Sequence, residues 1–303
     1  AFPDFSGRRF CEARVWSFFN HWTKGFERYL PWALGKDKDA EDMPLWIVPD
    51  RKLSVHDVEM CMRDHYEGTA MALDSSNIGG GVYEMPYRPT PLTFKVDGKE
   101  YFNERPVSTQ QTAFSFVSQL RSWLPREIGG IIWFGNDDAN MIAYTPVYCG
   151  NTVQPECYNT PGADAVTFSD KNAFWMCNFV SNMVYPRYSQ LFPELKAVRD
   201  SLDASYFAAQ KDVEAKAQAL YATDKTAAVK YLNDYSNEKA QQMLASWREL
   251  AKLIIVKYND MAVKNVKDGK ITRSVKRPGY PASFAKKLVK ATGEWYAVPK
   301  EDK

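Results

Sequence analysis

The chain has 303 residues, which is enough for one large domain or two smaller ones with a substantial core. Its hydrophobic share of 45% and charged share of 25% are ordinary for a globular protein. The net charge of +2 does not indicate a nucleic-acid or acidic-membrane partner. No stretch reaches the ~18 consecutive apolar residues that a membrane span requires, so no span is expected.

Two helices and a hairpin are predicted in the first third of the chain. Apolar residues recur at helical spacing from Val15 onward. Ser54 opens a second helix because Asp57, three positions later, completes a capping box, and Gly68 is expected to end it. Residues 92–102 predict a hairpin, since two short extended segments flank an Asp-Gly turn.

One pair of residues on the second helix has a spacing that chemistry uses. Cys61 and His65 are four positions apart and therefore share a side of the helix, as a thiolate–imidazole pair or two metal ligands would. No second Cys/His pair lies nearby, so no metal site is expected. We expect instead that Arg63, Asp64 and His65 form a hydrogen-bonded network that orients neighbouring loops.

Three strands of one sheet are predicted in the middle of the chain. Residues 112–117, 131–134 and 141–147 are rich in β-branched and aromatic residues, and Pro, Gly and Asp separate them. Small or polar residues alternate with Phe114 and Phe116, which predicts one buried face. The continuous apolar run 131–134 predicts a strand that is covered on both faces.

Polar, non-titrating side chains stand at the start of this sheet. Ser108, Thr109, Gln110 and Gln111 offer hydroxyl and amide groups that suit the backbone groups of a peptide. Arg105, just before them, suits a carboxylate, which a peptide carries at one end. The alternative is a polar strand end at the protein surface.

The C-terminal half is predicted to be mainly helical. Residues 171–185 form an aromatic-rich helix that Pro186 ends or kinks. The composition between Pro193 and Lys267 changes to Ala, Lys, Glu, Gln, Leu and Tyr, which predicts two or three long helices. The tail from Asp268 is basic and broken by Gly and Pro, with a short helix at 283–291.

Two of the five cysteines flank a short, turn-rich loop. Cys149 and Cys157 are predicted to form a disulfide if the protein is exported, because the loop brings them together and disulfides persist in oxidising compartments. Two free thiols are the alternative, since an odd number of cysteines does not indicate a fully paired framework.

Several ordered motifs resemble the dipeptidase family of N-terminal-nucleophile cysteine peptidases. They cover about residues 1 to 200. The matching segments are Met62–Thr69, Pro86–Pro89, Glu104–Thr112, Ile131–Ala139 and Phe174–Asn182.

The resemblance implies an α+β fold of two stacked antiparallel sheets flanked by helices, to which the C-terminal helical region is added. It also implies a catalytic cysteine at the mature N-terminus, whose α-amino group is the base. This chain begins with Ala1, and its first cysteine is Cys11. We therefore expect a further portion of the enzyme to supply the nucleophile and complete the fold, with no catalytic residue in this chain. No cofactor is implied.

The resemblance places Arg105 and residues 108–111 in the substrate site, with Asn136 and Asp137 second. A short peptide substrate and the further portion of the enzyme are the expected partners, and a homo-oligomer is left open. Secretion or a periplasmic location is expected, with the cytoplasm as the alternative. The predicted regions are a peptidase part (1–192), long helices (193–267) and a basic tail (268–303).

Two other functions remain open from the sequence. One is a self-contained cysteine hydrolase that uses Cys11 or Cys61 with a histidine. The other is a non-catalytic binding or scaffold module, which the Ala-, Lys- and Glu-rich helical half would suit.

Overall fold

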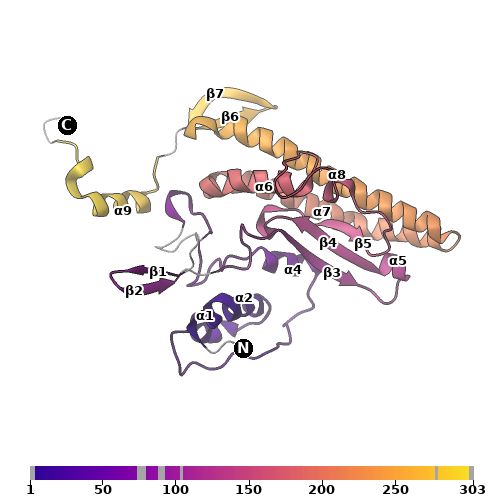
Figure 1. Ribbon diagram of the computed structural model, residues 1–303, viewed down its shortest axis with the longest axis horizontal. Coiled ribbons are helices and arrows are strands. Elements are labelled where there is room, and N and C mark those ends of the chain that lie inside the picture. Colours follow the sequence, from indigo (N-terminus) through magenta and orange to yellow (C-terminus); the bar gives the residue numbers. More distant parts are fainter. Residues whose placement is uncertain (1–3, 74–79, 88–92, 103–104, 277–278, 300–303) are drawn as a thin grey trace.

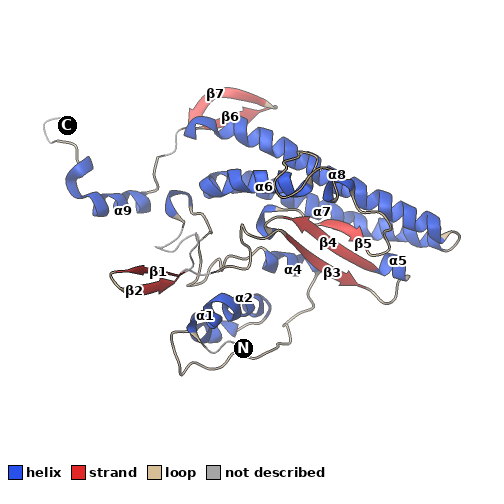
Figure 2. Cartoon of the chain, in the orientation of Figure 1, coloured by secondary structure: helices blue, strands red, loops and turns tan. Residues whose placement is uncertain are grey.

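The computed structural model describes residues 4–73, 80–87, 93–102, 105–276 and 279–299. Helices and antiparallel strands together form an α+β fold, as predicted (Figures 1 and 2). The helices are α1 (Phe5–Gly7), α2 (Ala13–Trp22), α3 (Leu30–Leu34), α4 (Val55–Met62), α5 (Arg126–Gly129), α6 (Ala173–Val184), α7 (Tyr188–Tyr221), α8 (Lys225–Tyr258) and α9 (Ala282–Thr292). The strands are β1 (Thr93–Val96), β2 (Lys99–Phe102), β3 (Phe114–Leu120), β4 (Gly130–Asn136), β5 (Thr145–Tyr148), β6 (Val263–Lys267) and β7 (Lys270–Lys276).

The local signals of the first hundred residues are confirmed. The Ser54 hydroxyl accepts a hydrogen bond from the Asp57 amide, and the Asp57 carboxylate accepts one from the Ser54 amide, which completes the capping box of α4. This helix ends at Met62, before the predicted stop at Gly68. β1 and β2 pair around the Asp97-Gly98 turn, where both residues have positive φ.

The central sheet has the strand order β3-β4-β5, and both pairs are antiparallel. Its inner face packs on α6, α7 and α8 in the main core. Ser115 and Val117 of β3 point to this core, while Phe114 and Phe116 on the opposite face are 55% and 49% exposed. The alternation was therefore predicted correctly, and the aromatic residues lie on the open face.

The prediction that β4 is covered on both faces was wrong. Ile131 and Trp133 are buried, whereas Ile132 and Phe134 are only half-buried. Their side chains share the open face of the sheet with the two phenylalanines of β3. A continuous apolar run in a strand therefore does not show whether one or both faces of the sheet are covered by other parts of the chain.

The long helices α7 and α8 form an antiparallel hairpin along the inner face of the sheet (Figure 1). The Asp224 side chain starts α8 by accepting hydrogen bonds from two backbone amides, of Thr226 and Ala227. Apolar residues at helical spacing form a buried stripe along α8, namely Met243, Leu244, Trp247, Ala251, Ile254 and Tyr258, and Trp247 is 0% exposed. The prediction of helix up to Lys267 was wrong at its end, because residues 263–267 form β6, which pairs with β7.

A second, smaller core lies under the N-terminal helices. It contains Trp16 of α2, Trp32 of α3 and Tyr66 from the segment after α4, with other apolar residues around them. α4 lies between the two cores because Val58 and Met62 pack against the main core. No helix among the described residues is long and apolar enough to cross a bilayer.

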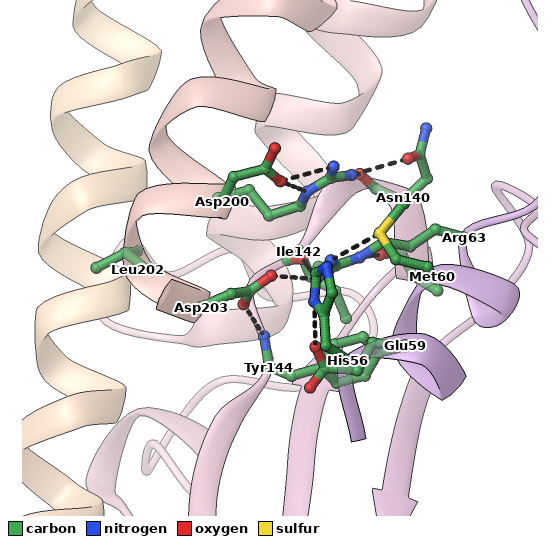
Figure 3. A network of polar contacts seen from close by, with 12 residues as sticks. His56, Glu59, Met60, Arg63, Asn140, Ile142, Tyr144, Asp200, Leu202 and Asp203 are labelled. Atoms are coloured by element: carbon green, nitrogen blue, oxygen red, sulfur yellow. Dashed lines mark hydrogen bonds and ion pairs between the residues drawn. The ribbon is translucent and has the colours of Figure 1, made fainter. Parts of the chain in front are cut away.

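A buried ion pair joins α4 to α7 (Figure 3). The Arg63 guanidinium lies 2.7 Å from the Asp203 carboxylate, and the side chains are 1% and 3% exposed. Arg63 also donates to the carbonyl oxygens of Ala139 and Ile142, and Asp203 accepts from the Tyr144 amide. The pair therefore fixes the connection between β4 and β5 as well as the two helices.

Replacing Asp203 by alanine should destabilise the fold by about 3–5 kcal/mol, because it leaves the Arg63 charge buried without its partner. Urea unfolding of the purified chain would measure this loss. The control is Asp234→Ala, which removes an exposed pair with Lys230 and should cost about 0–1 kcal/mol. Equal losses in the two variants would contradict the role of the buried pair.

Candidate functional site

Two segments with polar side chains meet at one end of the central sheet. Phe114, the first residue of β3, pairs with Asn136, the last residue of β4. Beyond this pair the Asp137 amide donates to the Ala113 carbonyl over 2.8 Å. The antiparallel register thus places Ala113 beside Asp137, and side-chain hydrogen bonds place Ser108 beside Asp138 and Asn140.

Asp138 is the centre of this end of the sheet, and sequence reasoning missed it as a site residue. Its carboxylate is fully buried and accepts hydrogen bonds from the Ser108 hydroxyl and the Tyr185 phenol. The Asn140 amide donates to the Ser108 hydroxyl over 3.0 Å. The buried carboxylate thus connects the segment before β3, the segment after β4 and the end of α6.

Three of the predicted site residues are held by hydrogen bonds within the chain, two of them buried and the third, Gln111, exposed. Ser108 and Thr109 are buried, and the Thr109 hydroxyl donates to the Gln111 side-chain oxygen. The Gln111 amide in turn donates to the Tyr87 phenol over 2.6 Å. Because their hydrogen-bonding groups have partners within the chain, these side chains support the loop that carries them.

Three other predicted residues present groups without a partner. Gln110 and Asn136 are half-buried, and neither side chain has a hydrogen bond to any described residue. The Arg105 side chain is exposed and forms no ion pair within the described part of the chain. Its backbone is held in place, since the Tyr66 hydroxyl donates to the Arg105 carbonyl over 2.7 Å. Two amides and a guanidinium therefore remain available at this end of the sheet.

Asp137 is buried next to these groups, with a positive φ of 78°. One carboxyl oxygen accepts from the Asn178 amide over 3.0 Å, and the other is buried without a partner among the described residues. Burial raises the pKa of Asp137 to about 7. Aspartate is among the residues that adopt a positive φ more readily than most, and the buried environment, not the backbone, favours the protonated form of its carboxyl group.

The predicted network of Arg63, Asp64 and His65 is confirmed. Asp64 accepts from the Ser17 hydroxyl over 2.6 Å and lies 3.1 Å from His21, which raises the pKa of that histidine. His65 is fully buried, and its Nδ1 lies 3.0 Å from a Glu67 oxygen, while its Nε2 has no partner among the described residues. Burial lowers the pKa of His65, but the hydrogen bond and charge of Glu67 outweigh it, so the pKa is raised overall.

The structure does not form the thiolate–imidazole pair that the spacing of Cys61 and His65 suggested. The His65 ring is bonded to Glu67, and burial raises the pKa of Cys61 to about 12. Burial likewise raises the pKa of Cys157 to about 12 and that of Cys177 above its ordinary value. These three thiols are therefore poor nucleophiles.

Cys149 and Cys157 are both free thiols in this structure, which is the alternative given in the sequence analysis, and a bridge between them in exported protein stays a prediction. Cys149 is exposed and lies against Gly130 at the edge of the sheet. Cys157 is buried in the main core, in a short turn that packs on α8. The loop between them thus joins two different environments. The described residues also contain no group of three or more His, Cys, Asp or Glu residues that could hold a metal ion.

A cavity of about 420 Å³ lies behind the site, between α2, α4 and α7, and Asn140 lies in its wall. Its charged groups are mostly neutralised inside the chain, so it offers little unpaired charge to a ligand. The pairs are Arg51–Asp57, His21–Asp64, Arg63–Asp203, Arg199–Asp200, Lys196–Asp200 and His65–Glu67.

The α+β fold and the peptide-like chemistry of this site agree with a class of peptidases. The sequence model of Peptidase family C69 matches residues 2–201, and the chain belongs to this family. The expected family relationship is thereby confirmed.

The chain is also similar to curated proteins that are named probable dipeptidases. The chain is 24% identical to a probable dipeptidase of Latilactobacillus sakei over 76% of this chain and 45% of that protein. It is 23% identical to probable dipeptidase B of Streptococcus pyogenes serotype M1 over 68% of this chain and 39% of that protein. A probable dipeptidase of Salmonella dublin is 27% identical over 46% of this chain and 28% of that protein. The chain spans less than half the length of these relatives.

The stability of Asp137→Asn relative to the unaltered chain should depend on pH. The pKa of Asp137 is raised by folding from 3.8 to about 7, so its stabilising contribution is complete below pH 4 and is lost as pH rises to about 7. Asparagine keeps the acceptor for Asn178 but never ionises. The free energy of unfolding of the variant, relative to that of the parent, should therefore rise by up to roughly 2–4 kcal/mol between acid and neutral pH.

Urea unfolding at several pH values between 4 and 8 measures this difference. Asp234→Asn, on the exposed surface of α8, is the control and should show a nearly constant difference over the same range. A constant difference for Asp137→Asn would mean that the carboxylate is well solvated.

Proposed function

We propose that this chain supplies the substrate-binding end of a dipeptidase of Peptidase family C69. The observation that carries the proposal is the set of unpartnered groups of Gln110, Asn136 and Arg105 beside a rigid buried network. Family membership and the dipeptidase names of the relatives support it.

A dipeptide offers one peptide group between two charged ends. The amides of Gln110 and Asn136 each donate and accept, which suits the N–H and C=O of that peptide group. The Arg105 guanidinium suits the C-terminal carboxylate, because its planar donors match two carboxylate oxygens. The three residues together would bind the peptide group and the carboxylate of a dipeptide, but not its ammonium group or its side chains.

The nucleophile in this proposal is a cysteine outside these 303 residues, at the amino end of a further portion of the enzyme. Its thiolate attacks the peptide carbonyl, and the carbonyl electrons move to the oxygen. Collapse of this intermediate expels the amine, which takes up a proton, and water then hydrolyses the thioester. An amide donor placed at the developing oxyanion stabilises the intermediate. The raised pKa values of Cys61, Cys157 and Cys177 support a nucleophile from elsewhere.

Catalysis of this kind needs donors that do not move during the reaction. Ser108 and Tyr185 hold the Asp138 carboxylate from two elements, so the ends of β3 and β4 cannot separate without leaving a buried charge unsatisfied. Asn136 is the last residue of β4, and Gln110 lies in the turn that precedes β3, two residues after Ser108. The proposed role of the network is therefore to hold the two amides in fixed positions.

We further propose that the open face of the central sheet is covered by a second sheet from the further portion of the enzyme. Phe114, Phe116 and Leu120 of β3 are 55%, 49% and 76% exposed on that face. Stacked sheets pack about 10 Å apart through such apolar faces. The stacking would complete the two-sheet fold that the family resemblance implies, and it would place the nucleophile at the edge shared by the sheets.

Replacing Gln110 or Asn136 by alanine in the complete enzyme should lower kcat/KM for a dipeptide by about tenfold or more. The reason is that each amide contacts the substrate, while its loss leaves no buried group without a partner. The melting temperature should change little. Ser201→Ala, an exposed position on α7 away from the open face of the sheet, is the control for both measurements.

Ser108→Ala tests the supporting network separately. It should lower the melting temperature, because Asp138 loses a donor in a fully buried site. A large loss of stability with unchanged kinetics in Gln110→Ala and Asn136→Ala would show that these residues are ordinary scaffold.

The 303-residue chain alone should hydrolyse no dipeptide, because none of its buried thiols is a competent nucleophile. The measurement is amino-acid release from a panel of dipeptides by the purified chain. Cys11→Ala is the decisive variant, since Cys11 is only partly buried. Robust turnover that this substitution removes would favour a self-contained cysteine hydrolase and contradict the proposal.

A further inference from the structure

The C-terminal segment from Val263 to Lys303 differs in charge from the rest of the chain. It has eleven Lys and Arg residues and four Asp and Glu residues, a net charge of +7. The remaining 28 basic and 33 acidic residues give the other part of the chain a net charge of −5. The small net charge of the whole chain is therefore the sum of a basic segment, residues 263–303, and an acidic remainder, residues 1–262. Such a charge asymmetry turns the basic segment toward an anionic surface.

None of the described side chains of this segment is buried. β6 and β7 form a hairpin beyond the end of α8, and α9 follows it. Figure 1 shows α9, in yellow, apart from the central sheet and from the bundle of α6, α7 and α8. The helix therefore has no core of its own to cover its apolar side chains.

The side chains of α9 are sorted by polarity around the helix. Phe284 and Leu288 are four positions apart and form one apolar stripe. Lys286 and Lys290 are also four positions apart, and Lys287 lies between them on the same side. α9 is thus an amphipathic helix with three lysines on its polar face, and all three are exposed.

Large aromatic side chains flank the helix at both ends. Tyr280, 62% exposed, packs on Phe284 with ring centroids 5.0 Å apart. Trp295 and Tyr296, in the turn after α9, are 81% and 61% exposed. Tryptophan and tyrosine prefer the interface between lipid headgroups and acyl chains, because they combine an apolar ring with a polar tip.

We propose that α9 and the turn Gly293–Tyr296 bind the surface of an anionic lipid bilayer. The helix lies in the plane of the membrane, with Phe284 and Leu288 toward the acyl chains and its lysines toward the headgroups. A nucleic-acid duplex would be recognised through its phosphates and would leave the apolar stripe of Phe284 and Leu288 without a contact. An apolar stripe and an exposed tryptophan beside a net charge of +7 favour an acidic membrane as the partner.

Co-sedimentation of the 303-residue chain with vesicles tests this proposal. The chain should sediment with vesicles that contain phosphatidylglycerol and phosphatidylcholine and remain in solution with phosphatidylcholine alone. High salt should weaken the binding, and the tryptophan emission of the chain should shift to the blue on binding, a shift that W295F removes. Reversing the three lysines of α9 (K286E, K287E and K290E) should weaken binding at least about tenfold.

Two further variants make the test specific. F284S with L288S removes the apolar stripe and keeps the charge, and it should also weaken binding. K211E, K230E and K252E make the same change of net charge on the exposed surface of α7 and α8, and binding should persist. The α9 variants should melt at the parent temperature, because α9 contains no buried residue. The variant on α7 and α8 loses only the exposed ion pairs of Lys230 with Asp234 and of Lys252 with Glu249, so its melting temperature should change little.

Several outcomes would overturn the proposal. Equal loss of binding in the two charge-reversed variants would mean a non-specific effect of net charge. Binding to phosphatidylcholine alone would exclude recognition of anionic lipid. Formation of a dimer that the α9 variants dissolve, or binding to a DNA duplex without binding to vesicles, would assign this surface to a second copy or to nucleic acid instead.

Discussion

The buried ion pair between Arg63 and Asp203 is the interaction on which the rest of this structure depends (Figure 3). Two charges removed from water are tolerated only if their remaining donors and acceptors are satisfied as well. Arg63 meets this condition through the carbonyl oxygens of Ala139 and Ile142, and Asp203 through the Tyr144 amide. The connection between β4 and β5 is therefore held between α4 and α7, and it cannot shift without exposing or isolating a charge.

That connection carries the candidate site. Asp138 lies at its start and receives hydrogen bonds from Ser108 and Tyr185, so the rigidity supplied by the ion pair extends to the start of β3 and the end of α6. The side chains without a hydrogen-bond partner belong to Gln110 and Asn136, each of which is two residues from a member of the buried network, Ser108 or Asp138. In a binding site of this kind, buried polar residues hold the backbone in place, and neighbouring residues with free polar groups bind the ligand.

The chain has two apolar surfaces that the described residues leave open, and their chemistry differs. The face of the sheet with Phe114 and Phe116 is broad, aromatic and without charge on β3, which suits a second sheet. α9 instead places Phe284 and Leu288 beside a row of lysines, which suits a boundary between an apolar and an anionic medium. The contrast explains why we propose a protein layer for the first and a membrane surface for the second.

Local patterns in the sequence predicted several of the elements and the family, although not every boundary. The capping box at Ser54, the hairpin at residues 92–102 and the stripe of α8 report backbone conformation and helical or strand periodicity, which are properties of neighbouring residues. Only the tertiary structure decided that Ser108 supports the site while Gln110 remains available, although two positions separate them. The reason is that the partners of Ser108 lie 30 and 32 residues away, and those of Arg63 up to 140 residues away. Burial and hydrogen bonding across such separations are set by packing, which no local pattern contains.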